Sequence, residues 1–278
     1  AMIGFRIKAT HQLNGQLDNL NAIASRPMLD YDHISGNWIE RETSNPASVY
    51  RYTLQSAANP KPATDAGIDL DALASWHDFC RLHDLKYDRA IEDKTMQLRD
   101  LLAEIAGAGR ASPRHNGLKW SVTVDRSDKP IVDHFNPRNS YDFRVTRSYV
   151  SPPDGFRVSF LDATNDYKPA ERIVPWPGKE ETELLLLEAL ELPGKTDPVE
   201  IYREARRRMY EAIYRPDIYT VSKDGPVQVA VRGDRVRLSS DVISSVQLAA
   251  RVKDVTGRLI ELDDAVTMEA GKSYAIRF

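Results

Sequence analysis

The spacing of apolar residues changes from a helical period to a strand period near residue 110. Before that point, apolar residues between Leu98 and Ile105 recur at i, i+3, i+4 and i+7, the pattern of an amphipathic helix. Helices are also predicted over 45–55 and 69–83. Beyond residue 110, apolar residues alternate with polar ones over 120–124, which is typical of a half-buried strand.

Two helix starts carry a capping signature. Asn45-Pro46 and Asp197-Pro198 each place a side chain that can cap a helix before a proline, whose fixed φ suits the first turn. The helix that starts at Asp197 is predicted to run to about Tyr214, because Arg215-Pro216 stops it.

Short alternating segments make up most of the remaining chain. Strands are predicted over 143–147 and 156–160, joined as a hairpin by the turn Pro152–Gly155. A strand through Ile3, Phe5 and Ile7 is predicted at the start, and a connecting segment over 25–44. After residue 217 the strands are short and close together, which favours a small barrel or sandwich.

These elements predict an α+β fold of several units, with mixed helices and antiparallel sheets and with small β-barrel or sandwich units. Three segments are expected. The first, over 1–44, contains a strand, a helix and a connecting segment. The second is an α+β domain over 45–216, and the third is a small β-barrel-like domain over 217–278. Because alternating residues run up to Phe278, we expect this last domain to be truncated and the chain to be a fragment of a longer one.

Composition narrows the class of protein. The chain has 278 residues, and 38 basic against 41 acidic side chains give a net charge of -3. A chain of this length usually divides its core, and this charge argues against a dedicated nucleic-acid or membrane-surface protein. The longest apolar run, Leu184–Leu187, is too short to span a bilayer. With Cys80 as the only cysteine, an intrachain disulfide is excluded.

One motif offers zinc ligands. His77, Cys80 and His83 are all residue types that bind zinc. On one continuous helix, however, the two histidines would lie about 9 Å apart along the axis, too far for a tetrahedral ion. The sequence therefore favours core packing, and no metal or cofactor site is predicted.

Two triplets resemble part of a phosphate-binding loop, Gly194-Lys195-Thr196 and Gly271-Lys272-Ser273. Each lacks the glycine five residues earlier that such a loop needs, so both are predicted to be turns. Gly107 and Gly109 lack a third glycine and are predicted to end a helix.

Charged clusters offer no diagnostic catalytic spacing. The acids Asp125, Asp128 and Asp133 precede His134 in a loop-rich stretch, and no catalytic residue is nominated. In the run Arg206-Arg207-Arg208, pairing of Glu204 with Arg208 and of Arg207 with Glu211 is expected on a solvated helix face. Arg232-Gly233-Asp234 is predicted to be a turn.

An ordered set of passages over about residues 45–255 resembles the tail-tip (host-specificity) proteins of lambda-like long-tailed phages and prophages. The matching passages are 45–47, 70–85, 96–105, 117–120, 125–126, 156–160, 166–167, 190–197 with the helix that follows, 231–239 and 241–242. The most specific is Leu-Glu-Leu-Pro-Gly-Lys-Thr-Asp at 190–197. The chain departs from this pattern over 57–67 and 127–140.

The resemblance implies a structural role without catalysis. Such a protein is a component of the virion tail, a baseplate hub-like part of the tail tip that connects the tail tube to host-recognition parts. The implied partners are other tail proteins, with a homotrimer in the assembled tail. The resemblance implies that the protein has no cofactor, no small-molecule substrate, no membrane span and no specific nucleic-acid partner. It also implies that the protein is made in the host cytoplasm.

A trimer needs interfaces, which are enriched in aromatic residues. Candidates are Trp38, Trp176, Tyr202, Tyr210 and Tyr214, although the sequence favours the intrachain core for each. Two other functions stay open. One is a cell-wall hydrolase, which would require paired carboxylates or a metal site in a cleft. The other is a receptor- or carbohydrate-binding module on the late β region, with aromatics such as Tyr274 as its platform.

Overall fold

The computed structural model describes residues 23–91, 95–147, 152–180, 184–223, 230–239, 252–263, 265–268, 270, 271 and 274. The predicted strand through Ile3, Phe5 and Ile7 lies outside these residues. The described residues form two compact units, one within 1–125 and 152–210 and the other within 126–151 and 211–278. The organisation into three segments stays a prediction.

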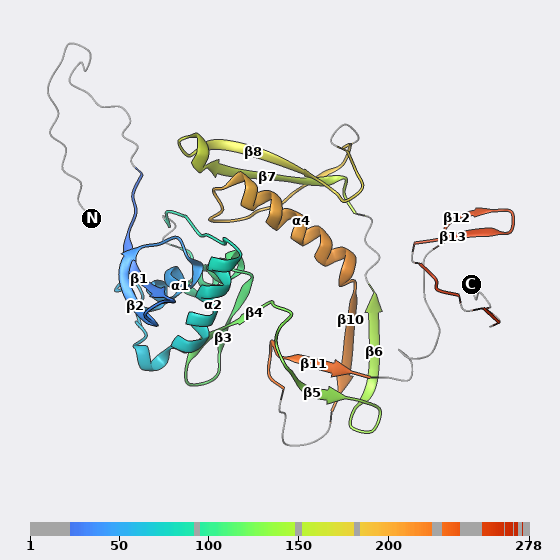
Figure 1. Cartoon of the computed structure of the whole chain (residues 1–278), viewed down its shortest axis with the longest axis horizontal. Coiled ribbons are helices and arrows are strands. Elements are labelled where there is room, and N and C mark those ends of the chain that lie inside the picture. Colours follow the sequence, from blue (N-terminus) through green and yellow to red (C-terminus); the bar gives the residue numbers. More distant parts are fainter. Residues whose placement is uncertain are drawn as a thin grey trace, which may run out of the picture. The chain divides into compact units, whose positions relative to one another are not determined.

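The first unit combines helices with short sheets (Figure 1). Its helices are α1 (Pro46–Gln55), α2 (Leu70–Leu82), α3 (Leu98–Ala108) and α4 (Pro198–Tyr214), whose last turn belongs to the second unit. Its strands are β1 (Pro27–Asp32), β2 (Asn37–Glu42), β3 (Ala111–His115), β4 (Trp120–Val124), β7 (Gly155–Asp162), β8 (Lys168–Pro175) and β9 (Leu187–Ala189). The predicted α+β class is confirmed.

The helix starts are fixed by the predicted caps. The Asn45 side chain accepts a hydrogen bond from the N–H of Ala47 at 3.0 Å, and Asp197 accepts one from Val199 at 2.7 Å. Each cap satisfies a backbone N–H that has no partner within the helix. Helix α4 ends at Tyr214, as predicted.

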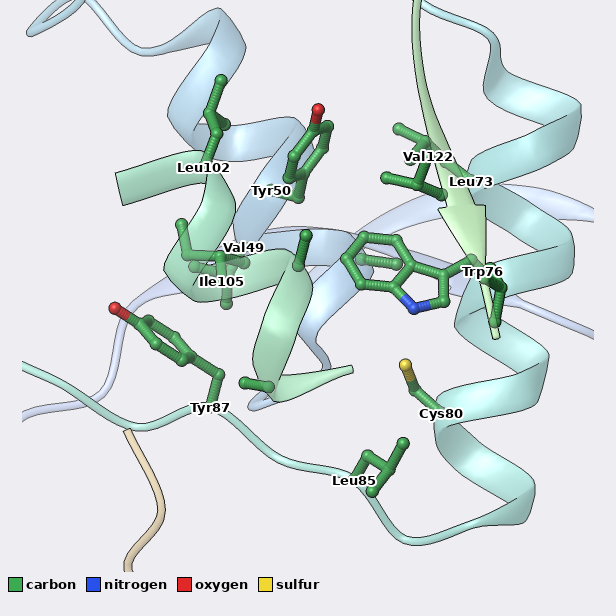
Figure 2. Packing of buried hydrophobic residues seen from close by; sticks show 14 of the residues in the cluster. Val49, Tyr50, Leu73, Trp76, Cys80, Leu85, Tyr87, Leu102, Ile105 and Val122 are labelled. Carbon is green, nitrogen blue, oxygen red and sulfur yellow. The ribbon is translucent and has the colours of Figure 1, made fainter. Parts of the chain in front are cut away.

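Helices α1, α2 and α3 enclose the larger core around Trp76 (Figure 2). The Trp76 indole meets the Tyr50 ring edge-on, with the ring centroids 5.7 Å apart. It also donates a hydrogen bond to the Gly109 carbonyl at 2.9 Å. A Cβ atom at Gly109 would lie 2.6 Å from the Trp76 ring. This position therefore requires glycine for close packing, in addition to the predicted helix stop.

A second, smaller core lies between α4 and the sheet of order β8-β7-β9. Its fully buried members are Val158 of β7, Val174 of β8, and Ile201, Ala205 and Met209 of α4. Figure 1 shows α4 lying across one face of β7 and β8. Since the three α4 residues recur every fourth position, they place one stripe of the helix on the sheet.

The segment predicted to be a connection over 25–44 is a hairpin, so that prediction is wrong. Strands β1 and β2 pair antiparallel, with Asp30 opposite Ile39. Few of their side chains are buried, so the hydrophobic alternation that predicts a strand is weak here. The buried carboxylate of Asp30 connects β1 to α1 and α2 through the hydrogen bonds described below.

Apart from the last turn of α4, the regular elements among the described residues of the second unit are paired strands. They are β5 (Ile131–Phe135), β6 (Tyr141–Arg147), β10 (Asp217–Ser222), β11 (Arg235–Leu238), β12 (Val252–Thr256) and β13 (Leu259–Leu262). Strand β6 pairs with β10, β11 runs parallel to β5, and β12 pairs with β13. None of these described sheets closes into a barrel.

The hairpin predicted between 143–147 and 156–160 is wrong. Both segments are strands, but β6 pairs with β10, and β7 pairs with β8 and β9. Among the described residues, no helix is long and apolar enough to cross a membrane.

Candidate functional site

The three residues of the zinc-like motif have separate roles. His77 is buried, with its Nε2 2.8 Å from Asp30 Oδ1. Cys80 is buried beside the Gly109 carbonyl, and burial raises the pKa of its thiol. His83 is exposed and follows the last residue of α2. Within the described part of the chain, no three His, Cys, Asp or Glu side chains are grouped to hold a metal ion.

Asp30 is the centre of a buried polar cluster. Its carboxylate accepts hydrogen bonds from Ser48 at 2.6 Å, from Thr43 at 2.8 Å and from Arg41 Nε at 2.6 Å. Burial alone would raise the pKa of Asp30, but hydrogen bonds from His77, Ser48, Thr43 and Arg41 together hold it well below its ordinary value. The Ser48 hydroxyl is fully buried and donates to the carboxylate, so its geometry is that of a structural group.

Lys195 lies in a second buried polar cluster. Its Nζ donates to the carbonyls of Lys86 and Ala108 at 2.6 and 2.8 Å, and to Glu200 Oε1 at 2.5 Å. The side chains of Lys195 and Glu200 are only 3% and 2% exposed. Because the ammonium uses all three of its donors inside the protein, the Gly-Lys-Thr triplet cannot present this lysine to a phosphate.

Two further ion pairs extend this cluster along α4. Arg110 donates to both carboxylate oxygens of Glu204, at 2.6 and 3.1 Å. Burial alone would raise the pKa of Glu204, but its bonds to Arg110 and the nearby cations lower it. Arg207 pairs with Asp125. The expected pairing of Glu204 with Arg208 is therefore wrong, because Glu204 turns inward to Arg110.

The acids singled out around His134 do not converge. Asp125 binds Arg207, Asp128 lies 3.1 Å from Arg126 Nε, and Asp133 lies 2.8 Å from Lys223 Nζ. His134 Nε2 lies 2.8 Å from the Ser239 hydroxyl. Each of these acids thus has its own basic partner, which is the arrangement of separate structural ion pairs.

A row of exposed tyrosine and half-buried arginine side chains lies along α4. Tyr202, Arg206 and Tyr210 recur every fourth residue and so share one stripe of the helix. The Arg206 guanidinium carbon lies 6.0 Å from the Tyr202 ring centroid and 5.4 Å from that of Tyr210. Arg172 of β8 lies 5.2 Å from the Tyr202 ring. We call Arg172, Tyr202, Arg206 and Tyr210 the tyrosine–arginine ladder.

The two tyrosines of the ladder are exposed, and the arginine between them is held in place. Tyr202 and Tyr210 are 38% and 40% exposed. Arg206 donates to the Pro175 carbonyl at 2.8 Å, which fixes its guanidinium between the two rings. Fixed tyrosine and arginine side chains lose little conformational entropy when they bind, and both are enriched at the centres of protein interfaces.

The other aromatics named from the sequence are distributed differently. Trp38 is half-buried against the larger core, with the Arg51 guanidinium 4.6 Å from its ring centroid. Trp176 is half-buried against the smaller core, edge-on to Phe156. Tyr214 is exposed at the end of α4. Helical spacing alone could have identified the ladder positions on α4. Arg172 could not be identified in this way, because it joins the ladder only where β8 packs against α4.

No family model matches the sequence, and no curated protein matches it. Among solved structures, the chain is similar to the tail protein from Neisseria meningitidis MC58, at 11% identity and a TM-score of 0.42, over 64% of this chain and 59% of that one. It is also similar to the prophage MuSo2 43 kDa tail protein from Shewanella oneidensis, at 10% identity and a TM-score of 0.37, over 62% of this chain and 55% of that one. The chain thus spans less than two thirds of the length of either protein.

Proposed function

We propose that the chain is a structural component of a phage or prophage tail, a baseplate hub-like part of the tail tip that connects the tail tube to host-recognition parts. The proposed partners are other tail proteins, with three copies of the chain in the assembled tail. The proposed role includes no catalysis. Its place is the virion tail, after synthesis in the host cytoplasm.

The tyrosine–arginine ladder is the observation that carries this proposal. Its side chains offer aromatic faces and a cation at a position that solvent reaches, and they are fixed before any partner binds. The ordered passages that resemble tail-tip proteins also support it. The most specific of them, 190–197, contains Lys195, whose buried hydrogen bonds hold that passage against α3 and α4.

The test uses single variants in the tail. Tyr202→Ala and Tyr210→Ala each remove one ring of the ladder without touching the buried stripe of α4. Both variants should fold, as judged by circular dichroism and thermal unfolding, and should be depleted from purified tails. Tyr167→Asn is the matched control, because Tyr167 is 37% exposed in the turn between β7 and β8 and has a φ of +54°, which asparagine tolerates.

Two outcomes would contradict the proposal. Full incorporation of both ladder variants would show that the ladder makes no assembly contact. Release of sugar or peptide ends from cell walls by the purified chain, lost when one acidic residue is replaced, would contradict the absence of catalysis.

A further inference from the structure

The sheet of order β8-β7-β9 has one face against α4 and an opposite face that is open among the described residues. Phe156 and Val158 of β7 pack in the smaller core beneath α4. Since side chains alternate along a strand, Arg157 between them points to the opposite face. The strand register places Arg157 beside Ile173 of β8 and Ala189 of β9. Arg157 and Ile173 are both exposed on this face.

The leucines that precede β9 line a hollow beside Arg157. The hollow has a volume of about 400 Å³ and is lined by Arg157, Leu184, Leu185, Leu186, Leu187 and Ala189. Leu185 and Leu186 are 96% and 65% exposed. Soluble proteins rarely expose neighbouring leucines to solvent to this extent. Such an apolar patch is typical of a binding surface.

The backbone of the leucine segment is anchored by Asp154. The Asp154 carboxylate accepts hydrogen bonds from the N–H groups of Leu185 and Leu186, at 2.9 and 2.7 Å. Lys179 lies 3.1 Å from the other carboxylate oxygen. These backbone bonds and Lys179 lower the pKa of Asp154 to about 2, so the anchor is ionised at neutral pH. The leucines are therefore presented before any partner arrives.

Strand β9 offers an open backbone edge. The Leu186 carbonyl accepts a hydrogen bond from Asp154 N–H at 2.8 Å, and Leu190 N–H donates to the Arg157 carbonyl at 2.9 Å. Residues 186 and 190 thus turn toward β7. Because the backbone groups of alternate residues point to opposite sides of a strand, those of Leu187 and Ala189 face away from β7. In the part of the chain that the structure describes, no strand pairs with that edge.

The charge on this surface selects the kind of partner. Among the described residues, Arg157 has no side-chain ion pair. Only the small side chain of Ala189 separates it from the open edge, so its guanidinium can reach a carboxylate on an added strand. A second copy that paired about a two-fold axis would bring like charges together, which is unfavourable. An acidic segment of another protein can instead form an ion pair with the Arg157 guanidinium.

We propose that the open edge of β9 binds an extended segment of a partner protein in which an acidic residue is flanked, two positions away on each side, by aliphatic residues. The backbone of the segment continues the sheet, its carboxylate pairs with Arg157, and its aliphatic side chains enter the leucine-lined hollow. Strand addition of this kind gains affinity from the backbone and specificity from alternate side chains. The inference does not depend on the proposed function.

The experiment selects binders from a random peptide library on the immobilised whole chain. We expect enrichment of peptides with one acid flanked at alternate positions by Val, Ile or Leu. The peptide acetyl-Thr-Val-Thr-Glu-Thr-Val-Thr-amide, titrated into labelled protein, should shift the NMR amide signals of Leu187 and Ala189. Replacing its Glu by Gln, or Arg157 by Gln, should weaken binding about tenfold, because either change removes the charge-assisted bond between the carboxylate and the guanidinium.

Lys168→Gln is the matched control, because it removes one positive charge from an exposed position on β8. It should bind both the selected peptides and the synthetic peptide like the unmodified chain. The proposal is overturned if the library gives no enrichment, if the enriched peptides bind Arg157→Gln equally well, or if the amide shifts lie away from β9.

Discussion

Gly194 lies directly against the ring of Tyr87: a Cβ atom at Gly194 would come within 2.3 Å of Tyr87 Cδ2. Tyr87 is buried and donates a hydrogen bond to Glu104 at 2.6 Å, so its ring cannot shift freely. The backbone at Gly194 also has a φ of +71°, which side chains other than glycine rarely adopt. The most specific passage of the sequence resemblance is therefore fitted closely to the core.

Gly194→Ala should destabilise the chain through both strain and overlap. The positive φ costs about 1–2 kcal/mol, and overpacking adds about 1–3 kcal/mol. Gly178→Ala separates the two effects, because Gly178 has a φ of +88° and open space around its Cα. Urea unfolding should show a larger loss of unfolding free energy at position 194. Equal losses of unfolding free energy at the two positions would show that the Tyr87 ring moves aside and that overlap contributes nothing.

Lys195→Met should cost about 3–5 kcal/mol of unfolding free energy, because it leaves Glu200 buried without its cation. Burial already raises the pKa of Glu200, and the Lys195 ammonium opposes that shift. Lys195→Met combined with Glu200→Leu should cost less than the single variant, since no buried charge remains. If the double variant is less stable than Lys195→Met, the unpaired Glu200 carboxylate is not the main cause of the destabilisation. Urea unfolding measures both.

Asp30→Asn should reduce both the stability and its dependence on pH. The pKa of Asp30 is lowered in the folded chain, so its contribution is present above the ordinary pKa of 3.8 and lost as pH falls below that value. At neutral pH the variant should lose about 1–3 kcal/mol, because buried donors lose a charged acceptor. Urea unfolding at neutral and acid pH should show a smaller acid loss in the variant. Parallel losses in the two proteins would contradict this role.

Asp154 should keep its hydrogen bonds to the leucine segment well into the acid range. Its pKa is lowered to about 2, so the bonds are retained at about pH 3.5, where an ordinary aspartate is mostly protonated. The NMR amide shifts of Leu185 and Leu186 should therefore stay constant down to that pH. A midpoint near 3.8 for these shifts would contradict the anchor. Asp154→Ala should speed amide hydrogen exchange at both leucines at neutral pH.

Local signals in the sequence were sufficient for the helices. Asn45 and Asp197 act within their own first turns, and the spacing of Leu98–Ile105 places Leu102 and Ile105 in the core without reference to distant residues. Such short-range effects depend only on neighbours in the chain.

Pairings between distant segments could not be predicted in the same way. Strand β6 carries alternating apolar residues, but nothing in its own sequence distinguishes β10 from β7 as its partner. The sequence gives no sign that Asp30 and Lys195 are buried in polar clusters. Their hydrogen-bond partners, such as His77 for Asp30 and the Ala108 carbonyl for Lys195, lie far away along the chain. The open β9 edge likewise results from sheet order, while the leucine run itself was visible only as an apolar segment.

Whether the chain is present in tails is the most direct test of its proposed structural role. Particles released by the strain that encodes the chain can be purified, labelled with an antibody to it and viewed by electron microscopy. We expect label at the tip of the tail, and quantitative mass spectrometry of the same particles should give three copies per tail. Particles with intact tails that carry neither the label nor the chain's peptides would contradict it.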